Sequence, residues 1–257
     1  EAHYALDQSR PGLVAGGEYE FDVVVRNKGV GHSFPGGTND SNEGWLEVSV
    51  VGEDGEALVL SGAVQDDGHV DPAAHFYKAL MVDNQGQAIH RRNAQDIVTA
   101  VYVRTIGPGT ADIAHYSFRV PEDYRGQQLT LRARLLWRKF DRAYTEFAFN
   151  NNRQGFARFD QVPELPVTEI TRGEVALAVG GASVSGAASE ADWVRFNDYG
   201  IGLLLQDDTQ GAARAFATVA RLVPKRLHGC RNLAKVAVRD GNLEQAYEYL
   251  EQCEKIT

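Results

Sequence analysis

Residues 19–25 read YEFDVVV and residues 128–137 read QLTLRARLLW. Both runs are short, rich in β-branched or alternating apolar side chains, and therefore typical of half-buried strands. Similar short runs lie at residues 45–51, 57–60, 97–104, 111–120 and 175–179. Several short strands at this spacing favour an antiparallel β-sandwich over alternating strand and helix units.

The tail of the chain has a different period. After Glu190 the apolar residues recur at helical spacing, and Ala212 and Phe216 are echoed 34 residues later by Ala246 and Leu250. This interval resembles the tetratricopeptide repeat, in which small residues let two short helices approach and a bulky one fills the groove. The next terminating proline would fall just past Thr257, so we expect the array to continue in a longer parent protein.

These two patterns predict an α+β chain with two domains. We expect an immunoglobulin-like β-sandwich with long loops at residues 1–180 and tetratricopeptide-type helical hairpins at residues 181–257. The small-residue run at 180–189 marks the predicted boundary.

Composition limits the classes of partner. The formal net charge is −9, which disfavours nucleic acid and anionic membrane surfaces as partners. No apolar run approaches the roughly 18 residues that a membrane-spanning helix needs. The sequence begins at Glu1 without an initiator Met or a signal peptide, and we interpret it as a processed product or part of a longer chain.

Both cysteines, Cys230 and Cys253, fall in the helical tail. Their spacing suits inward-facing positions on neighbouring helices, and we expect buried free thiols rather than a disulfide. The sequence contains no CxxC or CxxCH motif, which removes the usual signals for a cysteine zinc site or a covalently attached haem.

The densest polar stretch is GHSFPGGTNDSNE at residues 31–43, within a predicted long loop. Asp40, Asn42 and Glu43 could face a hard cation such as Ca²⁺, and His32 could offer its imidazole to a metal or haem iron. The alternative is a glycine-hinged loop whose polar side chains bind their own backbone.

A second polar loop reads DDGHVDPAAHFY at residues 66–77. His69 and Asp71, with His75, could form a Zn²⁺ or Ca²⁺ site together with His32 or His90 if the loops meet. The alternative is that Asp71 caps a short turn and His75 packs under Tyr77.

Two basic and aromatic stretches, at residues 90–93 and 137–144, contain Arg91 and Arg138. Arginine beside aromatic rings suits a carboxylate, a haem propionate or an acidic loop of a partner, and the alternative is internal pairing with Asp and Glu. The sequence has no nucleophile elbow, phosphate-binding loop, dinucleotide fingerprint or HExxH motif. Catalysis by this chain is therefore not predicted, although a metal-dependent enzyme stays open.

Several of these segments together resemble a known family. Five segments, followed by the repeats, are similar to the region downstream of the haem-bearing part in bacterial multihaem c-type cytochromes. They are VVVRN at residues 23–27, GHSFPGG at 31–37, DPAAHFY at 71–77, IGPG at 106–109 and RKF at 138–140. The resemblance covers about residues 18–257 and lacks the family's CxxCH segments.

The resemblance implies a periplasmic or extracellular location and a role beside haem c carried by the parent protein or a partner. It makes six residues candidates for positions near a haem: His32, His75, His90, His115, Arg91 and Arg138. We therefore expect a non-catalytic docking and scaffold part that packs against a haem-bearing domain or subunit and recruits protein partners through its repeats. A free-standing, metal-stabilised binding module is the alternative, and oligomerisation is left open.

Overall fold

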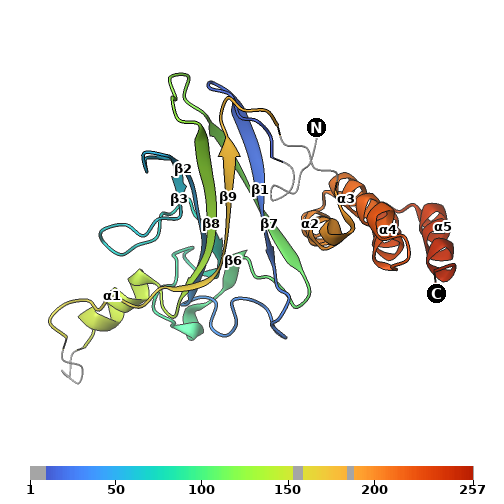
Figure 1. Cartoon of the computed structure of the whole chain (residues 1–257). Helices are drawn as coiled ribbons and strands as arrows, with labels where there is room; N and C mark the ends of the chain where they lie inside the picture. Colours follow the sequence, from blue (N-terminus) through green and yellow to red (C-terminus); the bar gives the residue numbers. More distant parts are fainter. Residues whose placement is uncertain (1–9, 153–158, 184–187, 257) are drawn as a thin grey trace. The chain divides into compact units, whose positions relative to one another are not determined.

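The computed structural model describes residues 10–152, 159–183 and 188–256 (Figure 1). It is a mixed structure of helices and antiparallel sheets, as the two periods in the sequence predict. The chain divides into two compact units, each built from several segments. One unit contains residues 30–106 and 128–176, and the other contains residues 1–29, 107–127 and 177–257.

The first of these units is built on a five-stranded sheet. Its strand order is β3-β2-β8-β9, and β4 also pairs with β2; the bounds are β2 Glu43–Gly52, β3 Ala57–Ser61, β4 His75–Tyr77, β8 Gln128–Arg138 and β9 Thr168–Ala178. The central pair, β2 and β8, is antiparallel over its whole length. Trp45 is fully buried and packs with Val70 and Leu136, and its indole nitrogen donates to the Gly62 carbonyl at 2.9 Å.

The same unit contains a second, two-stranded sheet and one α-helix. Strands β5 (Ala79–Val82) and β6 (Thr99–Val103) pair antiparallel, and a 3-10 turn at Ala94–Asp96 precedes β6. Helix α1 spans Arg142–Asn150 directly after β8, and Asp141 caps it by accepting from the Tyr144 amide. Capping of this kind satisfies one of the free amides at the start of the helix.

The other unit joins a strand pair to the helical tail. Strands β1 (Glu18–Arg26) and β7 (Ala111–Arg119) pair antiparallel without a register break. After a 3-10 turn at Glu190–Asp192, the helices are α2 Trp193–Leu205, α3 Thr209–Leu222, α4 His228–Arg239 and α5 Leu243–Glu254. Ile113 of β7 belongs to the same buried cluster as Leu203 and Phe216, so the strand pair forms part of the helical core.

Three of the four small and bulky positions that define the repeat pattern are buried, and the fourth is exposed. Ala212, Phe216 and Ala246 are buried, and a side chain at Gly200 would come within 2.6 Å of the Phe216 ring. Leu250, the predicted counterpart of Phe216, is instead 45% exposed, because no helix follows α5 within the described residues to cover it. The prediction that Leu250 fills a groove is therefore wrong for this structure.

The expectation of free thiols is also wrong. Cys230 on α4 and Cys253 on α5 form a disulfide, with their Cα atoms 5.7 Å apart. The antiparallel hairpin places position 230 near the start of α4 opposite position 253 near the end of α5, a Cα separation that a disulfide can bridge.

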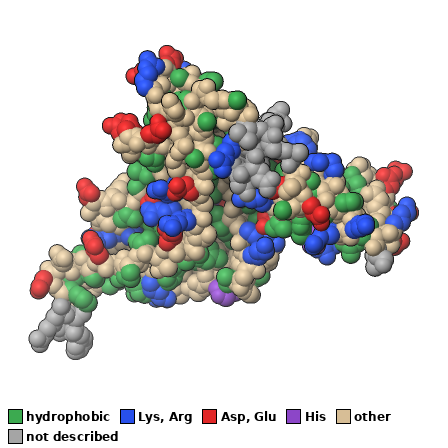
Figure 2. Space-filling view, viewed as in Figure 1, with side chains coloured by type: hydrophobic (Ala, Val, Ile, Leu, Met, Phe, Trp, Pro, Cys, Tyr) green, Lys and Arg blue, Asp and Glu red, His purple; other side chains and the backbone are tan. Residues whose placement is uncertain are grey.

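Two finer expectations stay predictions, namely the β-sandwich and the tetratricopeptide identity of the hairpins. The boundary near residue 180 also stays a prediction about which segments fold alone, because the compact units do not test it; part of the run at 180–189 lies outside the described residues. No helix in the described ranges has the length and apolar content needed to cross a membrane. Acidic and basic side chains are interspersed over the face shown in Figure 2.

Candidate functional site

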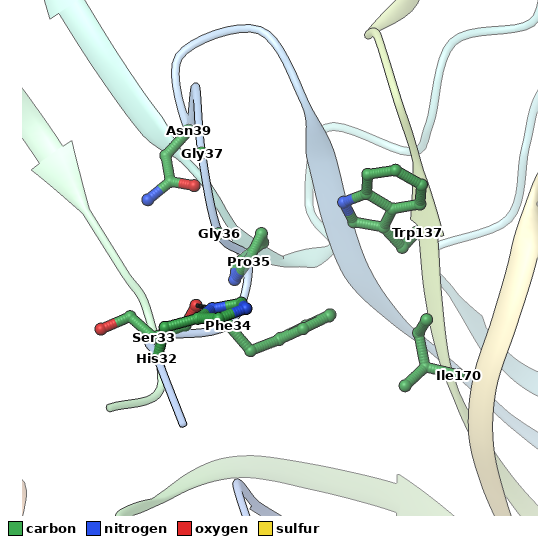
Figure 3. Close-up of a pocket in the computed structure, with 9 residues that line it drawn as sticks. All are labelled: His32, Ser33, Phe34, Pro35, Gly36, Gly37, Asn39, Trp137 and Ile170. Carbon is green, nitrogen blue, oxygen red and sulfur yellow. Dashed lines mark hydrogen bonds between the residues drawn. The ribbon is translucent and has the colours of Figure 1, made fainter. Parts of the chain in front are cut away.

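The loop between β1 and β2 forms one wall of a pocket of about 690 Å³. Trp137 on β8 and Ile170 on β9 contribute from the neighbouring strands (Figure 3). The lining residues are His32, Ser33, Phe34, Pro35, Gly36, Gly37, Asn39, Trp137 and Ile170. The volume lies in the range of small-molecule and cofactor sites, and most of the lining side chains are apolar or aromatic.

Backbone and side-chain bonds hold this loop in place. Phe34 and Ile106 exchange two backbone hydrogen bonds of 2.8 Å, and the side-chain amide of Asn42 donates to the Gly36 carbonyl at 3.0 Å. The Phe34 ring meets Tyr77 edge-on at 6.2 Å between centroids. Asn42 is thus a positioning residue of the pocket wall in this structure.

Among the described residues, His32 is the one imidazole that lines the pocket. Its Nδ1 lies 2.8 Å from the carbonyl oxygen of Ser33. A carbonyl oxygen can only accept, so Nδ1 is the donor in this contact. A histidine that binds a metal through one nitrogen commonly donates its other N–H to a carbonyl in this way.

The residues of this loop that were predicted to bind one cation do not share a site in the structure. Glu43 accepts from Arg138 and Lys78 in the protein interior, and Asn42 holds Gly36, while Asp40 lies in the turn before them. Among the described residues there is no group of three or more His, Cys, Asp or Glu side chains arranged to hold a metal ion. The described residues therefore offer no ligand set for the divalent cation that the sequence predicts, and a cation titration is needed to test that expectation.

The second polar loop matches the alternative expected for it. Asp71 accepts from the amides of Ala73 and Gly62, at 2.9 and 3.1 Å, so it caps a turn. His75 packs against Tyr77 with 5.2 Å between ring centroids, and its Nε2 accepts from Arg104 at 2.8 Å. His69 instead lies 3.8 Å from Glu146 on α1.

The basic and aromatic stretches meet on α1. Phe140, Tyr144 and Phe147 form a row with centroid distances of 4.9 and 6.5 Å. Three cations lie over these rings: Lys139 over Phe140, Arg92 over Tyr144 and Arg91 over Phe147, at 5.7, 6.0 and 5.2 Å. The spacing of 140, 144 and 147 is the sequence signal for a helical stripe, and we did not predict this helix.

Arg138 is placed differently from Arg91. Its guanidinium is buried against Trp45 and binds Glu43 with two nitrogens, at 2.8 and 2.6 Å. It therefore follows the alternative of internal pairing, whereas Arg91 and His90 are exposed.

His115 belongs to the other unit, on β7. Its Nδ1 lies 2.7 Å from Asp22 Oδ1, and its Nε2 lies 3.3 Å from the side-chain oxygen of Gln206. Partial burial lowers the pKa of His115, but the hydrogen bond and charge of Asp22, aided by Gln206 and Asp112, raise the pKa above its ordinary value. The site favours the imidazolium form.

Comparison with known proteins finds weak structural similarity to solved structures and no match in sequence. No family model matches the chain, and no curated protein matches it. It is similar to a penta-heme cytochrome c552 from Thermochromatium tepidum, with 16% identity, 62% of this chain and 36% of that chain covered, and a TM-score of 0.46. It is also similar to a family 123 glycoside hydrolase from Clostridium perfringens, whose structure concerns glycolipid glycan hydrolysis. The identity is 8%, the match covers 72% of this chain and 27% of that chain, and the TM-score is 0.25. The chain thus spans well under half the length of either structure, and neither similarity assigns its function.

Proposed function

We propose that this chain is the docking and scaffold part of a multihaem c-type cytochrome, and that the His32 pocket receives the edge of a haem carried by the parent protein or a partner. The observation that carries the proposal is the place of His32 in the pocket wall, where its Nδ1 donates to the Ser33 carbonyl and this contact holds the ring in its orientation. The sequence resemblance supplies the identity of the group.

The lining fits a haem edge in its chemistry. Phe34, Trp137 and Ile170 offer aromatic and apolar surface for the macrocycle, and a neutral imidazole is a common axial ligand of haem iron. Haem supplies the electron-transfer chemistry when it is present. The chain's own residues would position the haem, exclude water from its edge and offer Nε2 as a ligand or as a hydrogen-bonding neighbour of a propionate.

Two further features support an exported scaffold. A disulfide between Cys230 and Cys253 suits an oxidising compartment such as the periplasm. Leu243, Tyr247 and Leu250 on α5 are large apolar side chains that are exposed, and they suit a surface that recruits a protein partner or further repeats. The basic and aromatic row on α1 suits the carboxylates of an acidic partner segment.

The test is titration of the purified chain with a haem c undecapeptide that has one open coordination position, followed by its Soret absorption. We expect saturable, equimolar binding with a shift to the spectrum of a six-coordinate, bis-nitrogen haem. His32→Ala should weaken binding by about tenfold or more, equivalent to about 1.4 kcal/mol. His90→Ala changes an exposed histidine that the sequence also made a candidate near haem; because His90 does not line the pocket, this variant should bind as the unmodified chain does and serves as the control.

Absence of saturable binding would remove the haem-docking function. Equal weakening by both variants would show that any exposed imidazole suffices and would remove the pocket from the proposal. Binding with an unchanged five-coordinate spectrum that His32→Ala still weakens would support the propionate role of His32 over ligation.

A further inference from the structure

A buried group of four charged side chains lies where β2, β8 and the start of α1 meet. It consists of Glu43, Lys78, Arg138 and Asp141, whose side chains are between 7 and 10% exposed. Lys78 Nζ lies 3.2 Å from Asp141 Oδ2 and 3.3 Å from Glu43 Oε1. No haem or pocket role involves Lys78.

The two pairs within this group differ in geometry. Arg138 binds Glu43 Oε2 through two nitrogens at 2.8 and 2.6 Å and donates to the Gly68 carbonyl at 2.8 Å. Both nitrogens share one carboxylate oxygen, and their contacts are shorter than those of Lys78. The ammonium of Lys78 has two longer contacts with oxygens of different carboxylates, and burial of such an ion pair costs desolvation that these contacts repay incompletely.

We propose that Lys78 and Asp141 become joined by an amide bond between Lys78 Nζ and Asp141 Cγ, with loss of one water. A proton first passes from the ammonium of Lys78 to Asp141 Oδ2, which leaves an amine and a carboxylic acid. The amine lone pair attacks Cγ, and the second nitrogen proton passes through Glu43 to the departing hydroxyl. Water leaves, Glu43 returns to its carboxylate form, and no oxidant or other reactant is needed.

Each neighbour has a role in this step. Glu43 Oε1 lies 3.3 Å from Nζ and acts as the general base, and the guanidinium of Arg138 holds the other oxygen of Glu43 in place. The other oxygen of Asp141, Oδ1, accepts from the Tyr144 amide at 2.8 Å. That amide is positioned to stabilise the negative charge that develops on Oδ1 during attack.

Formation of the amide removes one buried positive charge, that of Lys78, and one buried negative charge, that of Asp141. The remaining charges of Arg138 and Glu43 neutralise each other. The amide also ties the connection between β4 and β5 to the residue that caps α1. A covalent link at this point would close a loop of 63 residues. Such a link restricts the unfolded chain and holds α1 against the sheet.

The experiment is a tryptic peptide map of the full chain after reduction of its disulfide, with fragmentation spectra of linked peptides. We expect a branched peptide that joins Lys78 to Asp141 and is lighter by one water than its two parts, together with loss of cleavage after Lys78. Lys78→Arg keeps the charge and should abolish the branched peptide. Glu43→Gln keeps the shape and should slow its formation at least tenfold in freshly refolded protein.

A map of the unmodified chain in which cleavage after Lys78 is complete and both peptides have their unlinked masses overturns the proposal, whatever the variants do. A branched peptide that forms equally fast in Glu43→Gln contradicts the role of Glu43 and requires a different base. Loss of water localised elsewhere, such as at Glu1, also counts against the link.

Discussion

The hydroxyl of Tyr199 on α2 donates to Asp22 Oδ2 on β1 across 2.6 Å. The other oxygen of the same carboxylate lies 2.7 Å from His115 Nδ1 on β7. Asp22 is thus shared between a helix and the neighbouring strand, and burial, followed by the contact with Asp22, raises the pKa of the Tyr199 hydroxyl so that it stays a donor. This shared carboxylate makes the attachment of α2 to the strand pair sensitive to the charge of His115.

The first prediction concerns pH. The pKa of His115 is raised in the folded state, so its stabilising effect is full below the ordinary histidine pKa and is lost as the pH rises through the raised value. His115→Gln should therefore cost less and less free energy of unfolding as the pH rises above about 6.5, the ordinary histidine pKa. Denaturant titrations at several pH values measure this difference. A difference that stays constant with pH for His115→Gln would contradict the coupling.

The second prediction compares equivalent positions of the two hairpins. Phe216→Ala should lower the free energy of unfolding by about 3–5 kcal/mol, because Phe216 is fully buried. Leu250→Ala should cost about 1 kcal/mol or less, because its side chain is half exposed. Hydrogen exchange of the α2 to α4 amides provides the measurement. Similar losses for the two variants would show that α5 is covered in solution.

A third prediction tests close packing at Gly200. A Cβ there would lie 2.6 Å from the Phe216 ring, so Gly200→Ala should destabilise by about 1–3 kcal/mol despite its better helix propensity. Gly173→Ala on β9 meets no atom within 4 Å and serves as the control. Thermal unfolding of both variants decides the matter, and a stabilised Gly200→Ala chain would rule out the tight approach of α2 and α3.

A fourth prediction concerns divalent cations. Asn42 and Glu43 are bonded to other parts of the protein, and Asp71 accepts two amides, so we expect millimolar Ca²⁺ or Zn²⁺ and a chelator to leave the unfolding midpoint unchanged. Differential scanning fluorimetry at several cation concentrations is the measurement. A midpoint that rises with concentration would establish a bound cation and revive the metal-stabilised module.

Sequence patterns located most strands well, because burial of one face of a strand requires apolar and polar residues to alternate along it. Strands β1, β2, β3, β7 and β8 lie within a few residues of the predicted ranges. Strands β4 and β5 are only 3 and 4 residues long and carry too few positions to show a period. The start of β9 was missed because its first seven residues are exposed and lack an apolar pattern.

The candidate site was predictable only in part. The loop with His32 is conspicuous in sequence because it is rich in glycine and polar residues. Trp137 and Ile170 join it through the order of strands in the sheet, which local patterns do not encode. Nothing in the local sequence distinguishes Lys78, because its buried partners, Glu43 and Asp141, are 35 and 63 positions away.

The disulfide between α4 and α5 changes how these two helices can separate. Stacked hairpins ordinarily unzip from a terminus, one element at a time, because each is held only by its neighbour. Cys230 and Cys253 join α4 and α5 to each other, which on chain-entropy grounds contributes about 3 kcal/mol. In an oxidising compartment α5 can leave its place only together with α4, whereas a reductant would free it to peel away alone.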